Sequence, residues 1–283
     1  MKYKKKSIAV ISILCLLSAC NANDVSPETT KEGESLEKTS LITETEEHLE
    51  DGQYFAEAGQ YTSNWRDIVD VEVVNGNIKT ITFNAVNEVA TEYKRNKPNL
   101  EEKSEVTESN PDNDWETQLQ LLENYLVKNQ DSILELTKEN MPSIEGVTLD
   151  AFPLVELLQQ ALTAGPLETG AYQDGQYFAS LEDENHQIKH TINLLVHRGY
   201  IIAAHWDTTL PSDLKLTEEE QSYITQWNEQ ANLLEQHLIK YQDPTQITFN
   251  EENKTSDVSG VTIEVYQFIE LATKALASGP LLD

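Results

Sequence analysis

The chain has 283 residues, of which 49 are acidic and 20 basic, giving a formal net charge of −29 at pH 7. Hydrophobic residues make up 39%, enough to build cores, so a wholly disordered chain is excluded. The length suggests about two domains of ordinary size. The charge excludes nucleic acid as a partner, because binding it needs Lys and Arg to neutralise phosphates. Cys15 and Cys20 are the two cysteines, so the body of the protein has neither disulfides nor Cys-ligated metal centres.

The first residues predict a lipoprotein signal. Residues 1–6 carry four lysines, and the apolar run that follows over 7–19 is too short to span a bilayer. The run ends Leu17-Ser18-Ala19-Cys20, which resembles a bacterial lipobox whose cysteine takes a diacylglyceryl group. We therefore expect a signal peptide over 1–19, with Cys20 lipidated and anchoring the chain to the membrane. The alternative is an ordinary signal peptide in which Cys20 is incidental.

Residues 20–50 are expected to form a tether. Nine acidic residues and two lysines lie between positions 21 and 50, with no Phe, Tyr or Trp. Such a composition cannot bury enough apolar surface to order itself, which predicts a lipidated, disordered acidic segment. Thirty residues of flexible coil reach about 30 Å, so the folded part would be held off the membrane and free to swing.

The rest of the chain is an internal duplication of one unit. Four blocks recur in the same order, which indicates a duplication into tandem domains over 51–170 and 171–283. The largest insertion between the copies is the acidic stretch Arg95–Asp114. The paired blocks are Asp51-Gly52-Gln53-Tyr54 with Asp174-Gly175-Gln176-Tyr177, Trp115 with Trp227, Gly146-Val147-Thr148 with Gly260-Val261-Thr262, and Gly165-Pro166-Leu167 with Gly279-Pro280-Leu281.

Each unit begins with strands. After the Asp-Gly start, apolar residues alternate over 69–73 up to Asn75-Gly76, and the apolar pattern resumes over 78–83. Alternation on both sides of an Asn-Gly pair predicts a β-hairpin. The second unit repeats the pattern over 192–206, with a weaker turn signal.

Helices follow the strands. The spacing of Leu119, Leu122 and Leu126 predicts a helix led by Trp115, and the second unit has a matching run after Trp227. A final amphipathic helix is predicted to start at each Gly-Val-Thr, later or less regularly in the first unit because of Pro153. The fold class is α+β, with a small antiparallel sheet and packed helices in each domain.

The order of these motifs resembles the FMN-binding domain family, which includes subunits of sodium-pumping quinone reductases and of Rnf complexes. In that family a flavin transferase attaches FMN through its phosphate to the threonine that ends Asp-x-x-Ser/Thr-Gly-Ala-Thr. The resemblance implies covalent FMN at Thr262, preceded by Ser259 and Gly260, and less closely at Thr148. This chain departs from the pattern: valine replaces alanine before both threonines, and the first unit has Glu145, whose carboxylate would repel a phosphate, at the Ser/Thr position.

Physical chemistry makes such a site reasonable. A helix N-terminus favours an anion, and a glycine lets the backbone approach a phosphate closely. The alternative interpretation is purely structural: both threonines are helix N-caps. A flavin ring also needs an apolar or aromatic wall, for which the candidates, each alternatively plain core, are Tyr177, Trp206 and Phe268 in the second unit and Tyr54, Phe83 and Phe152 in the first.

The two-domain lipoprotein arrangement is similar to flavoproteins of Gram-positive extracellular electron transfer. The resemblance implies a carrier on the outer face of the cytoplasmic membrane. It would take electrons from a membrane quinol-linked oxidoreductase and pass them to extracellular acceptors such as ferric iron, with FMN supplying the redox chemistry. The alternative is a degenerate FMN-binding-like surface lipoprotein that binds a small molecule or a protein without redox activity. Either is compatible with processing of the signal peptide to a peptide pheromone.

Other chemistries are less well supported. His186 and His190 stand four apart but lead into a predicted strand, so a metal site is not expected there. The sequence has no Gly-x-Ser-x-Gly elbow, Rossmann fingerprint or P-loop, and acidic runs such as 218–220 are interpreted as solvated surface. An electron carrier is therefore favoured over an enzyme with its own substrate.

Overall fold

A computed structural model describes residues 48–95, 114–183, 188–209 and 217–281. The predicted signal peptide, Cys20, most of the tether and His186 lie outside the described residues. Residues 47–283 form one compact unit. Within it we call residues 48–170 the first half and 171–281 the second half.

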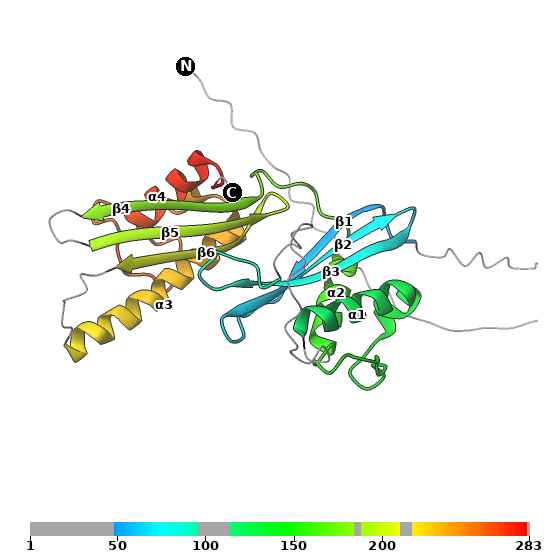
Figure 1. Cartoon of the computed structure of the whole chain (residues 1–283). Helices are drawn as coiled ribbons and strands as arrows, with labels where there is room; N and C mark the ends of the chain where they lie inside the picture. Colours follow the sequence, from blue (N-terminus) through cyan, green and yellow to red (C-terminus); the bar gives the residue numbers. More distant parts are fainter. Residues whose placement is uncertain (1–47, 96–113, 184–187, 210–216, 282–283) are drawn as a thin grey trace, which may run out of the picture. The chain divides into compact units, whose positions relative to one another are not determined.

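The first half holds a three-stranded antiparallel sheet, β1 (Gly52–Glu57), β2 (Trp65–Val74) and β3 (Asn77–Asn87), in the order β1-β2-β3 (Figure 1). Asn75 and Gly76 join β2 to β3 with φ angles of 54° and 72°. Two successive positive φ angles are what a tight hairpin turn of this hand requires. The hairpin predicted from the Asn-Gly pair is therefore confirmed.

The second half repeats this sheet with β4 (Gly175–Asp183), β5 (Ile188–His197) and β6 (Tyr200–Thr209), in the order β4-β5-β6. Arg198 and Gly199 form its turn with φ angles of 55° and 79°. Each hairpin also shifts register at the corresponding place, between Glu72 and Val73 and between Leu195 and Val196. The two sheets thus share both their strand order and the position of this register shift.

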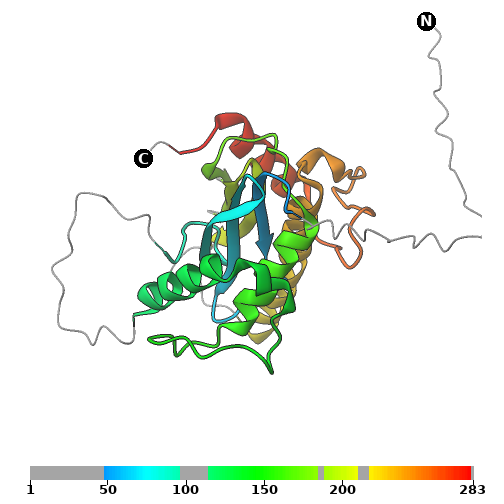
Figure 2. The ribbon, with the colours of Figure 1, turned by 90° about the vertical axis from the view of Figure 1, so that its right-hand side faces the viewer.

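Helices cover one face of each sheet. In the first half α1 (Trp115–Lys128) packs on β3, and α2 (Phe152–Ala164) packs on β1 and β2. Figure 2 shows these two helices, in green, in front of the strands they cover. In the second half α3 (Glu218–Tyr241) packs on β6, and α4 (Tyr266–Ser278) packs on β4 and β5. Short 3₁₀ helices, η2 (Gln130–Glu135) and η3 (Pro244–Gln246), follow α1 and α3. The class is α+β, with two small antiparallel sheets.

The cores follow the predicted periodicities. The alternating valines of β2 point into the first core, where they meet the leucines that α1 presents every three or four residues. In the second core the same roles fall to alternate residues of β5 and to Ala231, Leu234 and Leu238 of α3. Helix α3 begins at Glu218, well before Trp227, with a capping box between Thr217 and Glu220. A helix led by tryptophan therefore occurs in the first half alone.

The repeated Asp-Gly and Gly-Pro-Leu blocks meet in the fold. Asp51 Oδ1 accepts a hydrogen bond of 2.8 Å from the backbone N–H of Gly76, which closes the hairpin turn. A side chain on Gly52 would place its Cβ 2.7 Å from Cβ of Pro166, so glycine is needed where the proline packs. The second half makes the same contacts with Asp174, Gly199, Gly175 and Pro280.

The sheets also contact each other through their outer faces. A third apolar cluster joins them, and Asp70 of β2 lies 2.9 Å from His197 Nε2 and 2.8 Å from Arg198 Nε. Burial raises the pKa of the half-buried Asp70 carboxyl, but hydrogen bonds with His197 and Arg198 lower it by more, so this pKa lies below its usual range. The buried members of the cluster are Ile68, Val86, Ala90, Leu195, Ile202 and Ala203.

Candidate functional site

Thr262 is exposed and directly follows a turn, and it does not lie at the start of a helix. The turn runs from Val258 to Val261, whose N–H donates to the Val258 carbonyl at 3.3 Å, and Gly260 has a φ of 88°. Helix α4 begins four residues after Thr262, and its N-cap is Val265. In the first half α2 begins four residues after Thr148, with Ala151 as its N-cap. The prediction that the last helix of the second half starts at Gly260-Val261-Thr262 is therefore wrong, whereas the later start predicted for the first half is confirmed. The interpretation of the two threonines as N-caps is wrong in both halves.

A glutamine from the preceding helix explains the difference. Gln230 of α3 accepts hydrogen bonds at its Oε1 from the N–H of Thr262 at 2.6 Å, the N–H of Ile263 at 3.1 Å and the hydroxyl of Thr262 at 3.1 Å. The backbone donors that would have opened a helix are thereby satisfied by a side chain. In the first half Gln118 of α1 accepts the same three bonds from Thr148 and Leu149. We call each arrangement a glutamine latch.

The two threonines differ in how well they would suit a bound phosphate. Both are exposed. In the first half Asp150 Oδ1 accepts from the Phe152 N–H at the start of α2, and Pro153 has no N–H to offer. The start of α4 has no capping side chain and no proline. Each threonine has an acidic residue two positions later, Asp150 in the first half and Glu264 in the second. The difference is that Asp150 already accepts from a first-turn N–H of α2, whereas no side chain caps the first turn of α4, whose donors would favour an anion.

The aromatic candidates for a flavin wall are almost all core residues. Trp206 contacts Trp227 and Phe268, with ring centroids 4.5 Å and 5.5 Å away. Phe152 is half-buried. The alternative of plain core therefore describes the other five, which are Tyr54 and Phe83 in the first half and Tyr177, Trp206 and Phe268 in the second.

A second feature, which the sequence analysis did not predict, is a buried glutamate on helix α1 and another on helix α3. Glu123 of α1 accepts a hydrogen bond of 2.8 Å from the N–H of Phe83 in β3, and Glu235 of α3 accepts one of 2.7 Å from the N–H of Trp206 in β6. Since β3 and β6 are edge strands, their outward N–H groups need a partner from outside the sheet. Each glutamate supplies it.

The available sequence signal was a shared spacing of polar residues within an apolar helix pattern. Gln118, Glu123 and Gln130 recur 112 positions later as Gln230, Glu235 and Gln242. Gln130 and Gln242 also bind edge strands, because their side-chain oxygens accept from the N–H groups of Ile78 and Ile201.

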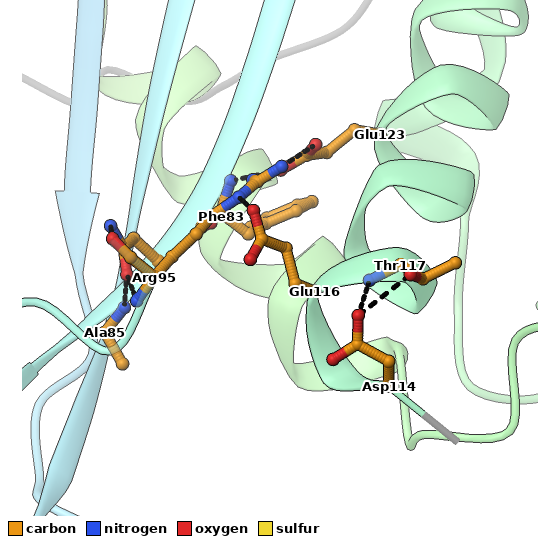
Figure 3. Close-up of polar contacts among 8 residues, drawn as sticks. Phe83, Ala85, Arg95, Asp114, Glu116, Thr117 and Glu123 are labelled. Atoms are coloured by element: carbon orange, nitrogen blue, oxygen red, sulfur yellow. Dashed lines mark hydrogen bonds and ion pairs between the residues drawn. The ribbon is translucent and has the colours of Figure 1, made fainter. Parts of the chain in front are cut away.

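In the first half an arginine pairs with this glutamate. Figure 3 shows the Arg95 guanidinium pointing at Glu123, with Nη1 2.6 Å from Oε1 and Nη2 3.3 Å from Oε2. Arg95 also donates from Nη1 to the carbonyl of Phe83 and from Nε to Glu116. Its backbone N–H donates to Oδ1 of Asn84 at 2.8 Å. The buried carboxylate is therefore held by a bidentate ion pair.

Among the described residues of the second half, the glutamate has no such partner. Glu235 is 8% exposed, and burial, together with the nearby Asp207, raises its pKa to about 8. His205 Nδ1 lies 3.8 Å from Glu235 Oε1, but burial lowers the pKa of His205, so the imidazole is uncharged near pH 7. Glu235 is therefore a protonated carboxyl at neutral pH.

A cavity of about 260 Å³ opens beside Glu235. Trp206 and Asp207 of β6 and Asn228 of α3 line it, with further residues of both halves. The indole N–H of Trp206 is buried without a hydrogen-bond partner in the described structure. None of the residues that line this cavity belongs to the glutamine latch of Thr262.

Neither a metal cluster nor a membrane span occurs in the described part of the chain. Over residues 48–95, 114–183, 188–209 and 217–281, no three His, Cys, Asp or Glu side chains are grouped to hold a metal ion. Within the same ranges, no helix has the length and apolar character needed to cross a bilayer.

No protein-family model matches the chain, and no curated protein does. Among solved structures, a Clostridium thermocellum protein determined by solution NMR is 30% identical, with a match over 41% of this chain and 92% of that one and a TM-score of 0.32. The CPE2226 protein of Clostridium perfringens is 20% identical over 38% of this chain and 88% of its own, with a TM-score of 0.28. At these TM-scores neither likeness bears on function.

Proposed function

We propose that this chain is a lipid-anchored electron carrier with FMN esterified to Thr262. The observation that supports it is the setting of the Thr262 hydroxyl, which belongs to an exposed residue directly after a glycine turn and bonds to Gln230, just before a helix whose first turn has no capping side chain. An enzyme that modifies this hydroxyl would find it accessible and in a defined position. Ser259, in place of Glu145 of the first half, adds no negative charge beside the phosphate.

The latch is suited to such an attachment. A flavin transferase would use a flavin adenine dinucleotide as donor. The bond from Thr262 Oγ1 to the phosphorus of the FMN part would form as the pyrophosphate bond of the donor breaks, and AMP would leave together with the hydroxyl proton. The bond from the hydroxyl to Gln230 would be lost, but the two backbone bonds from Thr262 and Ile263 to the same oxygen would remain. The turn would therefore keep its shape when the hydroxyl is consumed. Gln230 is a positioning residue in this proposal.

FMN would supply reversible electron transfer, and the protein would hold it and set its surroundings. The net charge of −29 disfavours an anionic reduced flavin and so lowers its reduction potential. Lipidation at Cys20 would keep the carrier on the outer face of the cytoplasmic membrane, between a membrane quinol-linked oxidoreductase and extracellular acceptors such as ferric iron. Covalent attachment would prevent loss of the cofactor outside the cell.

A second candidate function is a surface lipoprotein that binds a small molecule without redox activity. The observation that favours it is the cavity beside Glu235, which is separate from the Thr262 turn.

Intact-protein mass spectrometry tests the first candidate. The full chain is co-expressed with a flavin transferase, and we expect a mass increase of one covalently bound FMN. Thr262→Ala should abolish the increase, and the matched Thr148→Ala variant should keep it. An unshifted mass together with no flavin absorbance would overturn the proposal and leave the second candidate. Two bound FMN would contradict the assignment to a single threonine.

A further inference from the structure

The walls of the Glu235 cavity are the counterparts of the residues that hold Arg95. Arg95 makes hydrogen bonds or ion pairs with four residues of the first half, and each has an equivalent in the second half at the spacing of the duplication. All four equivalents line the cavity. The pairs are Phe83 with Trp206, Asn84 with Asp207, Glu116 with Asn228 and Glu123 with Glu235.

The equivalence is geometric as well as sequential. Phe83 and Trp206 occupy the same place in their edge strands, because each donates its N–H to the glutamate of the helix that covers it. Glu116 and Asn228 each stand seven residues before that glutamate on the same helix. The cavity therefore lies where the first half places a guanidinium.

No cation of the described chain takes that place in the second half. The lining residues include no Lys or Arg. Arg198 is engaged with Asp70, and Arg66 pairs with Glu57 and donates to the carbonyl of Ile202. Among the described residues, the position of the Arg95 guanidinium in the first half thus corresponds to a cavity in the second half.

The lining selects for positive charge. Glu88 and Asp207 contribute carboxyl groups, and Glu235 contributes one that a bound cation would favour in its ionised form. The side-chain amides of Asn228, Asn232 and Gln236 contribute further acceptor oxygens. A phosphate would be repelled by these carboxyl groups, so the cavity is not a second place for a flavin phosphate. Within the described ranges the acids do not form a group suited to a metal ion. An organic cation with several spread donors matches them better.

We propose that this cavity binds the guanidinium or alkylammonium group of a small organic cation, in the place that the Arg95 guanidinium occupies in the first half. The rings of Tyr61 and Trp206 would contact the alkyl stem, as aromatic walls commonly do in small-molecule sites. A volume of about 260 Å³ restricts the ligand to a small molecule. This inference does not depend on the flavin.

NMR titration of the full chain tests it. The probe is N-propylguanidinium, which is an arginine side chain without its backbone, and N-propylurea is the uncharged control of similar shape. We expect saturable shifts of the indole and amide N–H signals of Trp206 with the cation and none with the urea. At pH 8.5, where Glu235 of the free protein has lost its proton, Glu235→Gln keeps the oxygen that accepts from the Trp206 N–H but removes the charge, and it should weaken binding at least tenfold.

The first half provides an internal control. Arg95→Ala opens the corresponding position, so N-propylguanidinium should stabilise that variant beyond its effect on the wild-type chain. Agmatine should bind the wild-type cavity more tightly than L-arginine, because the carboxylate of arginine would face Glu88 and Asp207. The proposal is overturned if the Trp206 signals of the wild-type chain do not shift saturably, or if Glu235→Gln binds as tightly as the wild type.

Discussion

The two halves satisfy an edge-strand N–H group in the same way but differ in the partner of the glutamate that accepts from it. Each covers an edge strand with a helix whose glutamate accepts a strand N–H, Glu123 in one half and Glu235 in the other. The first half pairs that glutamate with Arg95, whereas the second leaves it beside a cavity, with a pKa of about 8. The role of the glutamate in the strand contact is therefore separable from its charge. In the first half a side chain of the chain itself pairs with the glutamate, and in the described part of the second half a cavity lies in the corresponding place.

At pH 7 the largest change in the free energy of unfolding is expected from Arg95→Ala, which removes the partner that distinguishes the first half from the second. Removing the arginine leaves a buried carboxylate without its ion-pair partner, which should lower the free energy of unfolding by about 3–5 kcal/mol. Urea denaturation at pH 7 measures it. Lys79→Ala is the control, since Lys79 lies 3.9 Å from Glu72 in an exposed pair worth about 0.5 kcal/mol or less. Equal losses in the two variants would show that Arg95 is not a structural partner of Glu123.

Neutralising each glutamate should shift stability in opposite directions. Glu123→Gln breaks the ion pair with Arg95 and should destabilise the protein by about 2 kcal/mol at pH 7. Glu235→Gln should stabilise it at high pH, by roughly 4–5 kcal/mol at pH 9. The sign follows from the raised pKa: the folded state keeps the Glu235 proton up to about pH 8, whereas the unfolded state loses it near its ordinary value. Wild-type stability due to this group is therefore fully present below pH 4.5 and lost as the pH rises through 8.

Thermal unfolding of the Glu123→Gln and Glu235→Gln variants between pH 4 and pH 9 tests these two predictions. The gain from Glu235→Gln should grow across this range and be near zero at its acidic end. A gain that does not depend on pH would mean that Glu235 has the same pKa in the folded and unfolded states, which contradicts a raised pKa.

Smaller effects are expected at the glutamine latches. Gln230→Ala removes the acceptor of three hydrogen bonds, two of them from backbone N–H groups, and should cost about 1–2 kcal/mol. Hydrogen exchange should accelerate at the amides of Thr262 and Ile263 and stay unchanged at Thr148. Gln118→Ala should give the converse result. Faster exchange in both halves from either variant would show that the latches are not local.

Local patterns predicted much of this fold. Alternating valines with Asn75-Gly76 predicted the first hairpin, and the leucine spacing after Trp115 predicted α1, because both signals arise within a few residues. The duplication predicted that the second half would repeat the first. The start of α4 was missed because the donors of Thr262 are taken by Gln230, which is 32 residues away in sequence.

The sites depended still more on distant partners. Arg95 opens what the sequence shows as an acidic insertion, and nothing local links it to Glu123, 28 residues further on. The cavity beside Glu235 lies where no described side chain of the second half replaces Arg95, and hydrophobic periodicity carries no information about such a space. Comparison of the two copies, helix against helix, was the one sequence signal that pointed to both glutamates.

The proposal of a redox carrier is tested most directly on the native lipoprotein, purified from the membrane of the cell that makes it. We expect a yellow protein whose visible flavin absorbance bleaches on reduction with dithionite and returns on addition of a ferric salt. A colourless protein that cannot be reversibly reduced would contradict the assignment of FMN to Thr262.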